Sequence, residues 1–213
     1  MQEEWTREMD GEALWQALRD KYESEPLPIR YLNQRFFKRV DHLLADVDAE
    51  DSVLELGAGP GVSSMHLYQT LGKNRTFAIS EGDARLVECL KAMKLPFPVS
   101  QEDITKLDRA DNSWDGLICL EVLEHLPSQA LVEQALQEIF RVAQKWVILS
   151  VPNEPLWRVL NMMRGAYWSD WGNTPGHINH WSPSAFAQLV GQYGTVVNME
   201  KPLPWTILKI QVP

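Results

Sequence analysis

Short apolar runs alternate with amphipathic segments from Ser52 to the end of the chain, which predicts β-strands separated by α-helices. The expected strands cover residues 53–56, 76–79, a short stretch from Val99 to near Asp103, 116–120, 146–151, 196–199 and 207–212. The expected helices cover 62–71, 83–93, 128–143 and 183–193. Strands separated by helices imply an α/β fold with a mostly parallel sheet that helices cover on both faces.

Two further amphipathic segments precede the first strand. Apolar residues at helical spacing predict helices over 4–22 and 30–45, and Pro26 and Pro28 break the chain between them. Because both segments lie ahead of the sheet, we expect residues 1–48 to form a helical cap over a site. Residues 49–213 would then form one compact domain with a lid insertion at 154–181.

Length and charge narrow the class of protein. A chain of 213 residues fits one α/β domain with an accessory cap. The net charge of −9 argues against a nucleic-acid binder, which needs a basic face, and against adhesion to anionic membranes. The one compact basic cluster consists of Arg35, Lys38 and Arg39, and we interpret it as a solvated helix face.

The expected lack of a signal peptide and the small number of cysteines predict a cytoplasmic protein. The first ten residues are polar and acidic, which predicts no signal peptide, and no apolar run approaches the length of a membrane span. The only two cysteines, Cys89 and Cys119, lie in apolar surroundings and are expected in the core.

The sharpest local signal is the segment 53–61, VLELGAGPG, where a strand runs into a glycine-rich turn that opens a helix. Gly57 and Gly59 allow a tight turn and a close approach of the backbone to a ligand. The third glycine, Gly61, comes one residue too early for a dinucleotide fingerprint, and no Lys-Ser/Thr pair follows as in a P-loop. Glu55 on the strand would repel a pyrophosphate but attract a cationic amine or sulfonium.

This segment resembles motif I of the class I S-adenosylmethionine-dependent methyltransferases. Further segments match that family at the expected spacing: Asp103-Ile104, 112–115 (NSWD), 120–127 (LEVLEHLP) and 147–153 (VILSVPN). The resemblance is strong over residues 50–155 and looser over 176–193. It implies a Rossmann-like seven-stranded sheet, with the last strand antiparallel, and S-adenosylmethionine as the cofactor.

The resemblance also implies roles for individual residues around the methionine part of the cofactor. Gly57, Ala58 and Gly59 would approach it closely, and Gly61 would complete the loop. Glu55 would help to hold its amino group.

On the adenosine side, the family places an acid at the end of the second strand, where it binds both ribose hydroxyls. The aligned residue here is Ser80 and the acid is its neighbour Glu81, which we favour as the ribose ligand. Asp103 would accept a hydrogen bond from the adenine amine, and Ile104 would pack on the ring. The floor near the sulfonium would be formed by Leu120 and Glu121.

Clues to the methyl acceptor come from the aromatic residues between 154 and 181. Large aromatic side chains line many ligand pockets, which favours an aromatic or otherwise apolar small molecule as substrate. The alternative is that they pack a lid onto the core. The candidate substrate-binding residues are Trp157, Tyr167, Trp168, Trp171 and Trp181.

Three histidines are candidates for catalysis. Methyl transfer needs an aligned acceptor and usually the removal of its proton, and histidine is the favoured base at neutral pH. His125, His177 and His180 all fall near the expected mouth of the site. We therefore expect O-methylation, with N- or C-methylation, a silent cofactor-binding subunit and an NAD-dependent oxidoreductase as the alternatives.

A divalent metal is a further hypothesis. Glu121, Glu124 and His125 are spaced i, i+3 and i+4, so a helix would project them to one side, and His177 could complete a four-ligand site. Two carboxylates and two imidazoles suit Mg²⁺, Mn²⁺ or Zn²⁺. The set resembles the metal-assisted O-methyltransferases of ubiquinone biosynthesis and of small-RNA 3′ ends. Many relatives without metal share the Glu-x-x-Glu-His string, and the alternative is that Glu124 and His125 only brace the loop.

Overall fold

The computed structural model describes residues 10–23, 27–154, 156–163, 165, 168, 171, 173–174 and 176–213. The first six residues of the helix expected over 4–22 therefore lie outside the described residues, as does Tyr167. None of the described helices is long and apolar enough to cross a membrane.

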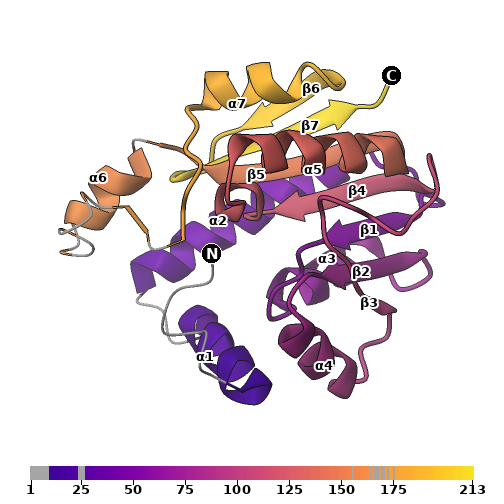
Figure 1. Ribbon diagram of the computed structural model, residues 1–213, viewed down its shortest axis with the longest axis horizontal. Coiled ribbons are helices and arrows are strands. Elements are labelled where there is room, and N and C mark those ends of the chain that lie inside the picture. Colours follow the sequence, from indigo (N-terminus) through magenta and orange to yellow (C-terminus); the bar gives the residue numbers. More distant parts are fainter. Residues whose placement is uncertain are drawn as a thin grey trace.

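The strands form one seven-stranded sheet in the order β3-β2-β1-β4-β5-β7-β6, as Figure 1 shows. The β1, β2, β3, β4 and β5 strands are parallel, and β7 is antiparallel to both of its neighbours. This confirms the predicted fold class and the antiparallel last strand. The strands are β1 (Val53–Leu56), β2 (Phe77–Glu81), β3 (Val99–Gln101), β4 (Trp114–Leu120), β5 (Ala143–Pro152), β6 (Thr195–Glu200) and β7 (Trp205–Gln211).

Helices cover both faces of the sheet (Figure 1). Alternate residues of a strand point to opposite faces, so in β4 Leu117 packs with α5 and α7 while Ile118 packs with α2 and α3. Because the central strands supply side chains to both cores, they form nearly unbroken apolar runs in the sequence. The helices are α1 (Gly11–Glu23), α2 (Leu27–Leu44), α3 (Val62–Leu71), α4 (Ala84–Ala92), η2 (Leu123–His125), α5 (Gln129–Val142), α6 (Leu156–Met163) and α7 (Pro183–Val190).

The segment ahead of the first strand is only partly separate from the sheet. The α2 helix buries Phe36, Val40 and Leu43 in the core beneath β7, so it is one of the covering helices. The α1 helix packs against α4, and its Trp15 donates a hydrogen bond from Nε1 to the carbonyl of Pro60 in the glycine loop at 3.2 Å. A helical cap over the site stays a prediction, which this contact of α1 supports.

Two elements differ from the sequence-based expectation. The β2 strand extends to Glu81, because Ser80 and Glu81 still pair with Ser100 and Gln101 of β3. The lid insertion contains α6, which was not predicted. The Asn161 side chain of α6 is buried and donates a hydrogen bond to the hydroxyl of Thr174 at 3.0 Å. This polar contact fixes the inner side of the short helix to the segment that follows it.

Candidate functional site

The glycine loop after β1 turns sharply against two neighbouring strands. Gly57, Gly59 and Gly61 have φ values of 75°, 53° and 82°, a region that favours glycine. The amides of Gly57 and Ala58 donate to the carbonyl of Ser80 at 2.9 and 3.0 Å. A Cβ on Gly57 would lie 2.4 Å from Cγ2 of Val122, so only glycine lets the loop approach the segment after β4.

Gly59 differs from the other two glycines because the space beside it is open. A Cβ there would meet nothing within 4 Å, so the loop presents bare backbone toward that space. The Gly59 amide donates to Oε2 of Glu81 at 2.8 Å, and the Asp83 amide donates to Oε1 at 2.9 Å. The carboxylate of Glu81 therefore lies at the end of β2 beside the loop.

Ser80 and Glu81, the two candidates for the ribose ligand, differ in exposure. The Ser80 side chain is buried, and its carbonyl is used by the glycine loop. Glu81 is partly exposed at the strand end, as expected if β2 is longer than its apolar run. The assignment of the ribose to Glu81 stays a prediction.

Glu55 lies in β1 beneath the loop and is only 1% exposed. Its two carboxylate oxygens accept hydrogen bonds from the hydroxyls of Ser63 and Ser64, both at 2.5 Å. Burial raises the pKa of Glu55 to about 7, because desolvation disfavours the carboxylate more than these two hydrogen bonds favour it. An ammonium group beside Glu55 would favour the ionised form.

The adenine candidates lie at the surface after β3. Asp103 is exposed, and its Oδ1 accepts hydrogen bonds from the amide and hydroxyl of Thr105 at 2.9 and 2.7 Å. Ile104 is partly buried against the core formed with α5 and α7. Asp103 thus caps its own turn through one oxygen.

The floor of the candidate site is the segment that follows β4. Leu120 is buried at its end, and Glu121 has a φ of 57°, which is uncommon for a residue other than glycine. Ser150 holds Glu121 in this conformation: its hydroxyl accepts from the Glu121 amide at 3.1 Å and donates to Glu121 Oε1 at 2.7 Å. Burial raises the pKa of Glu121 to about 7. Strained backbone of this kind is often found at functional sites.

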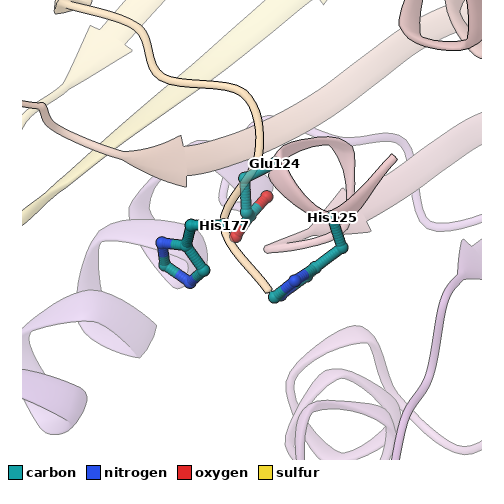
Figure 2. Close-up of side chains that lie close together, drawn as sticks. All are labelled: Glu124, His125 and His177. Carbon is teal, nitrogen blue, oxygen red and sulfur yellow. The ribbon is translucent and has the colours of Figure 1, made fainter. Parts of the chain in front are cut away.

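Glu124, His125 and His177 form a cluster, which Figure 2 shows in close-up. One ligand atom from each lies within 4.8 Å of the others, and the two imidazole rings are 5.1 Å apart at an angle of 78°. Neither carboxylate oxygen of Glu124 has a hydrogen-bond partner among the described residues, and its side chain is buried. Burial, with a smaller contribution from the charge of Glu121, raises the pKa of Glu124 well above its usual value.

Backbone hydrogen bonds bring His177 to this cluster from 52 residues further along the chain. The amides of Ile178 and Asn179 donate to the Glu124 carbonyl at 2.8 and 3.1 Å. The carbonyl of Gly176 accepts from Nδ1 of His125 at 3.0 Å. Since a carbonyl can only accept, Nδ1 carries the proton, and the lone pair of the neutral His125 ring lies on Nε2.

Two predicted members lie outside the cluster. Glu121 belongs to the predicted metal set, but it is not one of the three grouped residues, and its carboxylate binds Ser150. His180 is exposed, and its Nε2 lies 2.7 Å from Oδ1 of Asn173. Desolvation, with the charge of Arg158, lowers the pKa of the His180 imidazole.

The four predicted substrate-binding aromatic residues that the structure describes divide into three groups. Trp181 is buried in the core against Phe186, with ring centroids 5.7 Å apart, so its visible role is packing. Trp157 lies beside the cluster: its ring stacks on His177 at 6.0 Å. Trp168 and Trp171 are exposed. Tyr167 lies outside the described residues.

Two residues near the site were missed from the sequence. Ser150 fixes Glu121, and Trp205 packs between Trp157 and Phe36 with ring centroids 5.7 and 5.0 Å away. Ser150 could have been found from the sequence, because it is a polar residue inside the apolar run of β5. A buried hydroxyl needs a hydrogen-bond partner, so a serine at this position indicates a polar contact.

The described geometry agrees with comparisons to known proteins. The family model of the methyltransferase domain matches residues 29–198. Comparison with the curated proteins gives no significant match. The chain therefore belongs to the methyltransferase-domain family, as the resemblance predicted, and it is a class I S-adenosylmethionine-dependent methyltransferase.

Solved structures share the fold at low sequence identity. A protein from Pyrococcus horikoshii OT3 superposes with a TM-score of 0.68 at 16% identity, over 91% of this chain and 96% of that chain. Magnesium protoporphyrin IX methyltransferase from Synechocystis PCC 6803, with bound SAH, gives 0.64 at 20% identity, over 87% and 85%. The N-methyltransferase NodS from Bradyrhizobium japonicum WM9 gives 0.62 at 12% identity, over 85% and 97%.

Proposed function

We propose that the protein transfers the methyl group of S-adenosylmethionine to an oxygen of a small aromatic or otherwise apolar molecule. The observation that carries this proposal is the packing of Gly57 against Val122, three residues before His125. It joins the loop that would hold the cofactor to the segment that bears the candidate base. Incubation with S-adenosylmethionine and a panel of phenols, amines and activated carbon acids, with S-adenosylhomocysteine (SAH) formation as readout, tests it.

The residues around the glycine loop fit S-adenosylmethionine. Open space beside Gly59 would admit the methionine part, and Glu55 would face its ammonium group. Glu81 would bind the ribose hydroxyls, and Asp103 would accept from the adenine amine through its second carboxylate oxygen. The remaining contacts would come from Ala58, Gly61, Ile104, Leu120 and Glu121.

His125 is the favoured base in this proposal. S-adenosylmethionine supplies an electrophilic methyl group when it is bound. Nε2 of His125 would take the proton of the acceptor hydroxyl as its oxygen forms the new bond to the methyl carbon, and the carbon–sulfur bond would break to leave SAH. His177 and Trp157 would border the acceptor. His180 would lie at the rim.

Three alternatives have distinct outcomes in the panel. Turnover of amines alone would indicate an N-methyltransferase, which is the activity of the structural neighbour NodS. Turnover of carbon acids alone would indicate C-methylation. SAH binding without turnover of any acceptor would indicate a silent regulatory subunit.

The ribose assignment gives a direct test of the cofactor site. Glu81→Ala is expected to weaken SAH binding by about 1–3 kcal/mol, since the ribose hydroxyls lose a charged acceptor. Ser80→Ala is the matched control, and its affinity should stay close to that of the wild type because the Ser80 side chain is buried. Isothermal titration calorimetry with SAH measures both. A larger loss for Ser80→Ala than for Glu81→Ala would assign the ribose to Ser80 and contradict this step.

A metal-assisted version of the reaction is a second candidate, favoured by the grouping of Glu124, His125 and His177. A buried carboxylate whose oxygens have no hydrogen-bond partner among the described residues fits a ligand that a cation would complete. One carboxylate and two imidazoles suit Zn²⁺ or Mn²⁺, and Mg²⁺ would need more oxygen ligands from water or acceptor. Such an ion would hold the acceptor hydroxyl and lower its pKa.

Chelation separates the two versions. If the metal is required, dialysis against EDTA should abolish methyl transfer, one divalent cation should restore it, and elemental analysis should find that ion in the untreated protein. Glu124→Gln should then reduce the restoration without changing SAH affinity. Full activity after EDTA, with no ion recovered, would leave His125 and His177 as ordinary base and packing residues.

A further inference from the structure

The outer faces of α2 and α6 expose apolar side chains. On α2, Leu27 and Tyr31 are exposed one turn apart, and on α6, Val159 and Met163 are exposed one turn apart. Trp168 and Trp171 are also exposed beyond α6. We call these six residues the apolar face. Exposed apolar patches of this kind mark interaction surfaces more often than isolated exposed residues do.

In Figure 1, α6 lies at the left of the molecule, and α2 runs from the left toward the centre. Their inner surfaces meet through Trp205, which contacts Trp157 of α6 and Phe36 of α2. Trp157 in turn stacks on His177. Trp157 of α6 therefore borders the candidate site, and α2 is connected to it through Phe36 and Trp205.

The charge of this region is opposite to that of the whole chain. Residues 27–39 contain Arg30, Arg35, Lys38 and Arg39 and no acidic residue, whereas the net charge of the chain is −9. Arg39 pairs with Glu200 at 3.4 Å. The guanidinium of Arg35 lies 5.9 Å from the ring centre of Tyr31, so cations and the apolar face are interleaved on α2.

We infer that the apolar face, together with Arg30, Arg35 and Lys38, binds the surface of an anionic lipid bilayer. A helix with exposed apolar residues and cations lies in the interface of a membrane, with Trp and Tyr at the level of the headgroups. This deepens the proposed function and rests on it: the acceptor is a lipophilic molecule that enters the site from the bilayer. This proposal departs from two expectations of the sequence analysis, that the net charge of −9 disfavours anionic membranes and that Arg35, Lys38 and Arg39 form a solvated helix face.

Two other occupants fit the observations less well. A symmetric dimer through this face would place the cations of two α2 helices against each other. A single-stranded nucleic acid would use the cations and the tryptophans, but it would leave Leu27, Val159 and Met163 without a role, since bases stack on aromatic rings.

Sedimentation with vesicles tests the inference on the full chain without any methyl donor. We expect binding to vesicles that contain phosphatidylglycerol, little binding to phosphatidylcholine alone, and release at about 1 M salt, where the screening length falls to about 3 Å. The double variant Arg35→Glu/Lys38→Glu should bind at least about twenty-fold more weakly, given the contribution of each cation near an anionic surface. The control variant Lys73→Glu/Lys91→Glu changes the net charge by the same amount at exposed positions outside α2. It should lose less affinity for the vesicles than Arg35→Glu/Lys38→Glu does.

A matched pair of valines tests the apolar contribution. Val159 of α6 is 49% exposed and Val197 of β6 is 52% exposed, so aspartate should be tolerated by the fold at both. Val159→Asp should weaken vesicle binding several-fold, and Val197→Asp should bind as the wild type does. The inference would be overturned if the two variants lost vesicle binding equally or if the protein bound only neutral vesicles. It would also be overturned by concentration-dependent dimers that Val159→Asp dissociates, or by binding of single-stranded RNA in place of vesicles. SAH calorimetry on the same samples reports on the proposed function separately.

Discussion

Replacing His125 by alanine is expected to lower kcat for methyl transfer by about 10²–10⁴-fold, the usual contribution of a general base. The acceptor that the panel identifies would serve as substrate. SAH affinity should change little, because in the proposed site the cofactor is held by the glycine loop and Glu81, which contact each other, and not by His125. Single-turnover rates at saturating acceptor measure the effect on the chemical step itself.

Asparagine at position 125 is the informative control. Its side-chain amide can donate to the Gly176 carbonyl as Nδ1 does, but it offers no basic nitrogen. If His125 is the base, His125→Asn should be as slow as His125→Ala. Recovery of activity in His125→Asn would mean that His125 only holds the 176–180 segment in place. His180→Asn should keep most of the activity, since His180 lies outside the cluster.

Much of the sheet was predictable because its central strands are apolar runs that are buried on both faces. The bounds of β1 match the pattern of residues 53–56, where all four side chains are buried. The end of β2 was not predictable in this way, because Glu81 is polar and belongs to the strand only through its pairing with Gln101. The α6 helix was missed because its eight residues make only about two turns, which is shorter than the window of about 11–18 residues over which a helical period is recognised.

The candidate site was predictable where the residues are close in sequence. Glu124 and His125 stood out by their spacing, and the structure brings both to His177. Glu121 is separated from this group because its φ is positive and its carboxylate binds Ser150. The sequence spacing predicts neither this backbone conformation nor this hydrogen bond. Trp181 looked like the other aromatic residues of the lid, yet it packs on Phe186, since a pairing with Asn153 ties that position to the end of β5.

Three buried carboxyl groups make the stability of the protein depend on pH. Burial raises the pKa of Glu55 to about 7, that of Glu121 to about 7 and that of Glu124 further. The folded state thus holds these protons more tightly than the unfolded chain, in which a glutamate has a pKa of about 4.5. The stabilisation is complete below about pH 4.5 and is lost as the pH rises through about 7.

We therefore expect Glu55→Gln to flatten the pH dependence of stability. Glu55 accounts for a fall of about 3 kcal/mol in the free energy of unfolding as the pH rises through this window, the amount that corresponds to its raised pKa. Glutamine keeps a carbonyl oxygen for Ser63 or Ser64 and cannot ionise, so the variant should lose less stability over the same range. Urea unfolding at pH 5 and pH 8 measures the difference.

The same change at the surface provides the control. Glu88 of α4 is exposed, so Glu88→Gln should keep the pH dependence of the wild type. SAH should reduce the fall in wild-type stability, because its ammonium group beside Glu55 would favour the ionised carboxylate at high pH. In Glu55→Gln this part of the SAH effect should disappear. If Glu55→Gln and Glu88→Gln follow the wild-type curve equally, Glu55 is ionised in the folded state throughout the range, and its assignment as a buried neutral acid is wrong.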